Sequence, residues 1–208
     1  ADKSLWKVKL AITTRPCHQE ERDFAGCWRQ GTSTLNSDKI RERFGHYGVE
    51  LLEQDTRTRL ASLYSLSGEQ RITRTLALTR FELPTHPGVE AQDAQIRSGE
   101  SIGATLRKAG WSIVKNETID CQVTAGQRFA VLGGATLSPE DNVLLRVYTL
   151  NITRQDLSID YAIIAEAYHG EHIAPSTALP SATEVMPSLS ESQALALTDL
   201  LAAMQQRD

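Results

Sequence analysis

Arginines crowd two neighbouring segments of the chain that have strand-like sequences. They are Arg57, Arg59, Arg71, Arg74 and Arg80. Side chains alternate between the two faces of a strand, so Arg57 shares a face with Arg59, and Arg74 shares one with Arg80. A planar guanidinium makes two parallel bonds to a carboxylate, so Arg59 and Arg74 are candidate anchors for an anion. The alternative is that most of these arginines face solvent or pair with carboxylates such as Glu50, Glu53 and Glu82.

A second group of titratable residues lies late in the chain, from Glu166 to His172. His169 and His172 are three residues apart with carboxylates beside them, and such residue types can bind a metal ion. Residues three apart on a strand point to opposite faces, however, and a strand end that runs into a polar loop explains the same pattern. We therefore expect neither a metal site nor a cofactor.

Composition narrows the classes of partner. The chain has 208 residues, of which 40% are hydrophobic and 23% charged, as in an ordinary globular domain. Its net charge of -4 argues against nucleic acid, because neutralising phosphates takes clustered lysines and arginines. No apolar run reaches the roughly 18 residues that a transmembrane helix needs, so no membrane span is expected. The sequence also lacks the glycine-rich nucleotide motifs and the serine-hydrolase motif.

Alternating apolar residues predict several strands. They are expected at 5–14, 49–53, 59–66, 71–82, 111–119, 128–132, 142–152 and 157–168. Hairpin turns are expected at 67–70 and 153–156. A short helix capped by Asn36 or Ser37 should end at Gly45, and a second helix over 98–109 should end at Gly110.

The C-terminal part has a different composition. Residues 174–190 are rich in proline, serine, threonine and alanine, which is typical of a linker. Ser190 and Gln193 have the spacing of a capping box, and an apolar stripe follows at helical spacing: Ala194, Leu197, Leu200, Leu201 and Met204. This stripe must dock on its own domain or on a second subunit, so a homo-oligomer is possible.

These elements predict an α+β fold with a mainly antiparallel sheet and a few helices on one face. We expect one domain over 1–173, a linker over 174–190 and an amphipathic helix over 191–208.

The cysteines and the first residue do not decide in which cellular compartment the protein is located. Cys17 and Cys27 could close a small loop in an oxidising compartment, or could be free and buried like Cys121. The sequence begins at Ala1, which fits either an exported mature protein or a trimmed chain. Both a cytoplasmic and an exported location, such as the periplasm, therefore remain open.

The order of short motifs over residues 36–173 resembles a known fold. The motifs are 38–44 in a helix, 67–69 after an arginine-bearing strand, 74–78, 99–106 at the start of a helix, and 161–166 on a late strand. This order is similar to the chorismate–pyruvate lyase fold, which is shared with the UTRA-like effector-binding domains of a class of bacterial transcription regulators.

The resemblance implies an antiparallel sheet with helical flaps closed over a buried ligand. In the lyases an arginine grips a carboxylate, a late glutamate meets the polar end of the ring, and backbone groups of two flaps complete the pocket. The matching positions are Arg59, Glu166, and the flap residues Ile40 and Ile102. Arg59 stands about one residue out of the family's register relative to Gly68, and a shift of one residue changes the face of a strand unless a bulge intervenes.

Three functions follow as hypotheses. The first is a domain that binds a small carboxylate ligand. The second is a lyase that releases pyruvate from chorismate or a related enolpyruvyl acid. There Arg59 would hold a carboxylate, and Glu166 would accept a hydroxyl hydrogen bond, or act as a general acid if burial raised its pKa. The third is an exported structural or assembly protein that uses the C-terminal helix to dock.

Overall fold

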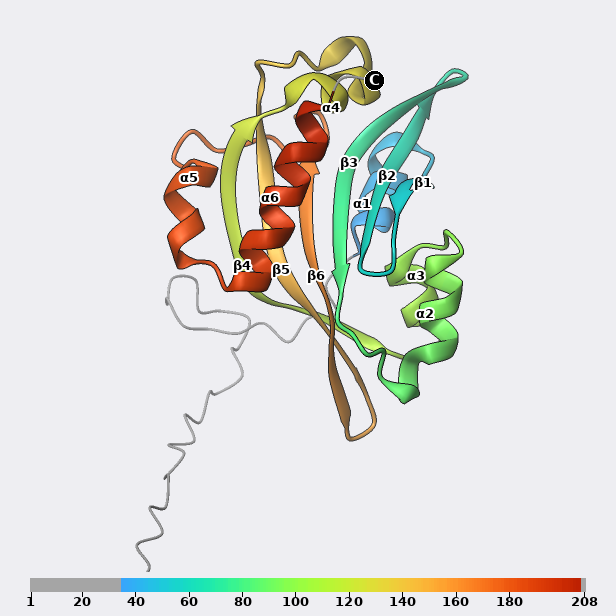
Figure 1. Cartoon of the computed structure of the whole chain (residues 1–208). Helices are drawn as coiled ribbons and strands as arrows, with labels where there is room; N and C mark the ends of the chain where they lie inside the picture. Colours follow the sequence, from blue (N-terminus) through green and yellow to red (C-terminus); the bar gives the residue numbers. More distant parts are fainter. Residues whose placement is uncertain (1–34, 207–208) are drawn as a thin grey trace, which may run out of the picture. The chain divides into compact units, whose positions relative to one another are not determined.

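A single antiparallel sheet organises the residues described by the computed structural model, which are 35–206. Its strands are β1 (Gly48–Gln54), β2 (Thr58–Ser67), β3 (Gln70–Phe81), β4 (Ser112–Thr124), β5 (Asn142–Arg154) and β6 (Leu157–Tyr168). The order across the sheet is β1-β2-β3-β6-β5-β4, and all neighbours are antiparallel. Two meanders, β1 to β3 and β4 to β6, therefore join where β3 pairs with β6 (Figure 1).

Helices lie on both faces of this sheet. One face packs against α4 (Gly126–Gly133), α5 (Ala182–Val185) and α6 (Glu191–Gln205). The other face carries α1 (Asn36–Phe44), α2 (Glu90–Arg97) and α3 (Ile102–Lys108). Short 3-10 turns complete the described chain: η1 (Pro87–Val89), η2 (Gly134–Thr136) and η3 (Met186–Ser188). The predicted α+β class is confirmed, but the helices occupy two faces where the sequence suggested one.

Strand alternation gives each face its own core. On β6, Ile163 and Ala165 belong to the core under α6, whereas Ala162 and Ile164 belong to the core on the opposite face. Neighbouring residues of a strand point to opposite sides, so a strand buried on both sides carries apolar residues almost without a break. This explains the uninterrupted apolar run near the end of β6.

The apolar stripe of α6 packs against its own sheet. Leu197 and Leu200 are 0% exposed, and burying each such side chain contributes about 1.5–3 kcal/mol. The predicted capping box is present, with Ser190 and Gln193 each bonding the backbone of the other. The proline-rich segment before it also packs, because Ala182 and Val185 of α5 are buried in the same core.

The structure confirms the predicted hairpin turns and the predicted end of the first helix. The β2–β3 turn contains Gly68 with φ 60°, and α1 ends at Gly45 with φ 75°. The β5–β6 turn lies between Arg154 and Leu157, as expected. The left-handed region favours glycine, which is why Gly45 and Gly68 could be recognised, whereas in the β5–β6 turn the residue with positive φ is Gln155.

The strand predicted over 128–132 is wrong, because these residues lie in α4. The buried residues Gly126, Phe129, Ala130 and Gly133 follow the spacing of one helical face. An apolar run as short as 128–132 does not distinguish the two-residue period of a strand from the 3.6-residue period of a helix.

Helix starts also differ from the prediction. Leu35 is the N-cap of α1 and makes no side-chain cap bond, while the Asn36 side chain bonds Thr75 and His172 instead. The helix expected over 98–109 begins at Ile102, and a separate helix, α2, precedes it. Tertiary partners outcompete local capping for Asn36.

Two further findings complete the fold. None of the helices described in residues 35–206 is long and apolar enough to cross a membrane. The predicted strand at 5–14 and the pair Cys17 and Cys27 lie outside the described residues. Cys121 is buried, and burial raises the pKa of its thiol to about 11.

Candidate functional site

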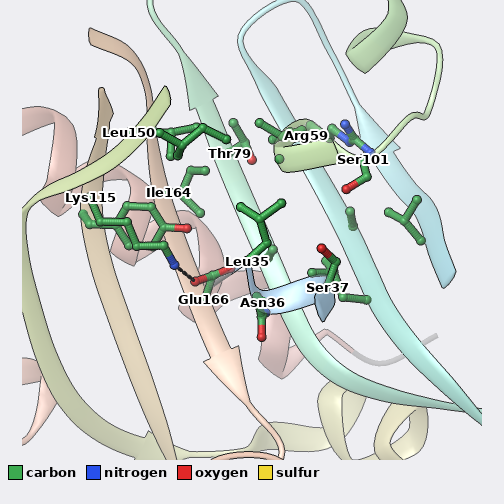
Figure 2. Close-up of a pocket in the computed structure, with 18 of the residues that line it drawn as sticks. Leu35, Asn36, Ser37, Arg59, Thr79, Ser101, Lys115, Leu150, Ile164 and Glu166 are labelled. Carbon is green, nitrogen blue, oxygen red and sulfur yellow. Dashed lines mark hydrogen bonds and ion pairs between the residues drawn. The ribbon is translucent and has the colours of Figure 1, made fainter. Parts of the chain in front are cut away.

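A cavity of about 90 Å³ lies between the sheet and the first turns of α1 and α3. A water molecule needs about 10–15 Å³ of such space, so the cavity has room for a small organic molecule. The lining is mainly apolar, and its charged members are Arg59, Lys115 and Glu166. Figure 2 shows Arg59 beside Ser101 on one side of the cavity, and Lys115 with Glu166 on the other.

Strand register brings Arg59 and Glu166 onto the same face. Ala77 of β3 pairs with Ala61 on one side and with Glu166 on the other, and Arg59 pairs with Thr79 two residues along. Directly paired residues share a face of the sheet. Arg59 and Glu166 are separated by two strand spacings across the sheet and by two residues along the strand direction. Their Cα atoms are therefore about 12 Å apart.

Arg59 is a buried cation held by main-chain oxygens. Its Nη1 donates to the carbonyls of Ile96 at 2.9 Å and Glu100 at 2.8 Å, and its Nη2 donates to the carbonyl of Gly99 at 3.3 Å. The residue is 2% exposed, and burial lowers the pKa of the guanidinium. The Ile96 carbonyl lies in the last turn of α2 and the other two follow that helix end, where the helix dipole is negative.

Nε of Arg59 has no partner among the described residues, and Nη2 makes one bond although it carries two protons. A guanidinium has five N–H groups, and the three bonds above use both protons of Nη1 and one of Nη2. Nε is buried and unpartnered within residues 35–206. The Nε–H and the second Nη2–H form one fork, which matches the two oxygens of a carboxylate.

Glu166 marks the opposite end of the cavity and is 4% exposed. Tyr168 donates to its Oε2 at 2.5 Å, and Lys115 Nζ lies 3.4 Å from the same oxygen. The Lys115 ammonium also lies 4.1 Å from the centroid of the Tyr148 ring. Tyr148 packs on the same face, so the carboxylate, the ammonium and the phenol form one buried cluster.

The pKa of Glu166 is lowered despite its burial. Desolvation raises this pKa, but the charge of Lys115 and hydrogen bonds from Tyr168, Lys115 and Tyr148 together outweigh it. Burial and the Glu166 charge raise the pKa of Tyr148 and of Tyr168, which keeps both phenols neutral. Glu166 is therefore ionised at neutral pH, which suits accepting a hydroxyl hydrogen bond and leaves it no proton to give as an acid.

The other predicted site residues have different surroundings. Ile102 lines the cavity, whereas Ile40 is 0% exposed and is not among the lining residues. Arg74 is also outside the lining: its Nε bonds Ser65 at 2.8 Å, its Nη1 bonds Glu171 at 2.5 Å, and its guanidinium lies 3.9 Å from the Phe44 ring centroid. A bulge opposite Leu63 and Tyr64 leaves Arg74 unpaired in the ladder and turns it toward α1.

Of the two histidines, His172 packs beside α1, and His169 lies beside η2, where its Nε2 is 3.3 Å from Thr136 Oγ1. His172 Nε2 lies 2.7 Å from Asn36 Oδ1, and His169 Nδ1 accepts from the backbone N–H of Glu171. No group of three or more metal-binding side chains occurs in the described part of the chain. Asn36 also bonds Thr75, so it ties the start of α1 to β3 at the cavity wall.

Sequence reasoning missed Lys115, Tyr47 and Tyr148, which all line the cavity. Tyr47 donates to Ser101 Oγ at 3.2 Å, and burial raises its pKa. Tyr148 and Leu150 are two residues apart on their strand and share a face, and this pattern indicates only that the face is buried. Nothing in the local sequence marks Lys115, because lysine is seldom buried unless it is paired.

Comparisons with known proteins add little. No protein-family model matches the chain, and no curated protein matches it. Among solved structures, the C-terminal domain of Yurk from Bacillus subtilis subsp. subtilis strain 168 is similar to this chain. The identity is 16%, the match covers 62% of this chain and 78% of that one, and the TM-score is 0.35. A similarity at this TM-score carries no argument, so the function has to be argued from the residues of the cavity.

Proposed function

We propose that the domain binds a small organic acid in the cavity between the sheet and the helices α1 and α3. The observation that carries this proposal is the buried Arg59 fork, whose partners within residues 35–206 are all carbonyl oxygens. A buried cation is costly unless it is compensated. A ligand carboxylate would supply the missing charge and two strong hydrogen bonds.

Charge balance within the cavity favours one anionic group on the ligand. Lys115 and Glu166 neutralise each other, so Arg59 leaves the lining with one net positive charge. A monocarboxylate therefore neutralises the site. At the far end a hydroxyl group can donate to the ionised Glu166, and Tyr47, Tyr148 and the aliphatic walls suit an apolar or aromatic body between the two ends.

Melting temperatures measured with a panel of small acids test this proposal. A ligand that binds only the folded state at a concentration 100 times its Kd adds about 2.7 kcal/mol to the unfolding free energy. We expect aromatic hydroxy acids such as 4-hydroxybenzoate to raise the melting temperature. Arg59→Lys, which cannot form the fork, should bind at least about tenfold more weakly.

The control is Arg57→Lys, because Arg57 is an exposed arginine at the start of the same hairpin. It should bind like the unmodified protein. If none of the acids shifts the melting temperature at millimolar concentration, the proposal fails. Equal losses in both variants would contradict a specific role for the Arg59 guanidinium.

The alternative function, a lyase, would use the same two ends of the cavity. Its product distinguishes it from a domain that only binds the ligand. Incubation with chorismate, followed by an assay for pyruvate, distinguishes turnover from binding. The ionised Glu166 favours binding, so we expect a melting shift with hydroxy acids and no pyruvate above background. Pyruvate release that is lost in Glu166→Gln would establish the lyase instead.

A further inference from the structure

Lys115 lies on the cavity face of β4, two residues after Ile113, and a bulge follows it. Ile113 and Lys115 pair with Ile152 and Leu150, on the face that lines the cavity. Further along, Asp120 pairs with Arg146 on that same face, although 115 and 120 differ by an odd number. In a regular strand these two residues would point to opposite faces. The register shift between Asn116 and Ile119 makes the change.

Glu117, inside this bulge, has a conformation that side-chain-bearing residues seldom adopt. Its φ is 51°, in the left-handed region. Its carbonyl accepts a hydrogen bond from Gln193 Nε2 at 3.1 Å, and its Oε2 accepts one from Thr149 Oγ1 at 3.3 Å. Strained backbone persists only where its surroundings hold it, and it concentrates at functional sites.

Gln193 connects this bulge to α6, on the opposite face of the sheet. It is 3% exposed and also forms the capping box with Ser190. Its side-chain oxygen accepts from the Ser190 backbone, while its nitrogen donates to Glu117. One side chain thus caps the helix and holds the bulge.

At the cavity, Lys115 places hydrogen-bond donors beside an acceptor. An ammonium group has three N–H donors, and one of them is directed to Glu166 at 3.4 Å. A ligand hydroxyl at this end can therefore donate to Glu166 and accept from Lys115 at the same time. An acid without the hydroxyl makes neither bond, and its entry would desolvate a charged pair without compensation.

From this geometry we infer that Lys115 is a specificity-determining residue, which selects organic acids that carry a hydroxyl group opposite the carboxylate, and that Gln193 is a positioning residue acting through the Glu117 bulge. The inference rests on the proposed function of the same cavity. It assigns α6 a role in ligand selection in addition to its role in the core.

The experiment measures the dissociation constants of 4-hydroxybenzoate and benzoate by calorimetry, and compares their ratio between variants. Lys115→Met should weaken binding of 4-hydroxybenzoate by about tenfold and change benzoate binding by less than about threefold. Lys115→Met/Glu166→Gln removes both charges, so no unpaired carboxylate stays buried. This double variant should bind the two acids nearly equally.

Gln193→Met and Ser190→Ala form a matched pair for the positioning role. Both remove one half of the capping box, but only the first removes the bond to Glu117. We expect the ratio of the two dissociation constants to move toward one in Gln193→Met and to stay unchanged in Ser190→Ala. Equal effects in both variants would overturn the positioning role.

A readout without ligand separates the possible failures. Carboxyl-carbon NMR of Glu166 should give a higher pKa in Gln193→Met than in Ser190→Ala, because Lys115 is displaced only in the first. If both acids bind but Lys115→Met leaves their ratio unchanged, the specificity role fails and the proposed function stands. If neither acid binds the unmodified protein, the proposed function fails and the specificity role with it, while the Glu166 titration still decides the positioning role.

Discussion

Arg59 is unusual among the arginines of this domain in how its charge is compensated. Arg74, Arg80 and Arg146 each bond a carboxylate, at 2.5, 2.7 and 2.7 Å respectively. Arg59 instead bonds three main-chain carbonyls, one in the last turn of α2 and two just after it, and its Nε has no partner within the described residues. Those three arginines have carboxylate partners within the protein, and Arg59 has the chemistry of a ligand anchor.

The carbonyl bonds of Arg59 also predict a structural role. Arg59→Met leaves the carbonyls of Ile96, Gly99 and Glu100 without their donor, so the free energy of unfolding should fall by about 2–4 kcal/mol. Urea denaturation without ligand measures this loss. Arg57→Met, at an exposed position, should change the same quantity by no more than about 0.5 kcal/mol. A similar loss in both variants would contradict the assigned bonds.

His172 predicts how stability depends on pH. Burial, together with the positive charges of Arg43, Lys39 and Arg74, lowers its pKa from 6.5 to about 4, against the opposing charge of Glu166. Between these two values the unfolded chain binds a proton that the folded chain does not. The free energy of unfolding should therefore fall as pH drops from 6.5 to about 4, by up to roughly 3 kcal/mol for this group.

The measurement is a series of denaturation curves across this pH range for the unmodified protein and for His172→Asn. The variant has no titrating group at this position, so its stability should depend less steeply on pH. His169, whose pKa is also lowered by burial, accounts for part of the slope that remains. Identical slopes in the two proteins would show that His172 is not held neutral by the fold.

The sequence could predict which residues reach the cavity only where the strand that carries them is regular. Arg59 and Glu166 were proposed as the positions that match the family resemblance, and the regular register between β2, β3 and β6 carries both to the cavity. Arg74 could not be placed, because a bulge skips it in the ladder, and the bulge just after Lys115 makes the rest of β4 change face. Bulges have weak sequence signals, and here glutamate occupies the strained position where glycine would have marked it.

Among the elements, α6 links the core to the cavity. Its buried face packs on β3, β5 and β6, and its first turn holds the β4 bulge through Gln193. Figure 1 shows α6 lying along the strands on the side of the sheet away from α2 and α3. The docking partner that its apolar stripe requires is therefore its own sheet.

Core packing of α6 gives a direct stability prediction. Leu200 is 0% exposed, so Leu200→Ala should lower the free energy of unfolding by about 2–5 kcal/mol through lost burial and the cavity left behind. Leu195 lies on the same helix and is 44% exposed, so Leu195→Ala should cost about 0.5 kcal/mol or less. Urea denaturation compares the two variants. If Leu195→Ala costs more, the apolar face of α6 has another partner in solution.

Strands and tight turns were predictable because their patterns are local. The boundaries of β6 match the predicted 157–168, since alternation and a hairpin turn fix its ends. Residues 128–132 form part of a helix because the face that matters extends to Gly126 and Gly133, beyond the apolar run that suggested a strand. Asn36 was expected as a cap, but it bonds two residues far along the chain, which local reasoning cannot supply.

At the scale of the whole molecule, the fold places one cationic cavity in a chain with a net charge of -4. Two apolar cores leave the sheet buried on both faces, so Arg59, Lys115 and Glu166 are charged groups within an otherwise apolar wall. In such surroundings charge interactions are stronger than in water, and discrimination between charged and neutral ligands should be large.

Calorimetric titration with 4-hydroxybenzoate and with its neutral amide, 4-hydroxybenzamide, tests the central claim most directly. The two molecules have nearly the same shape and differ in the carboxylate that the Arg59 fork would hold. We predict that the acid binds at least about tenfold more tightly than the amide, and that Arg59→Lys, which keeps the charge but loses the fork, reduces this difference. Equal binding of acid and amide, or no binding of either, would contradict the account.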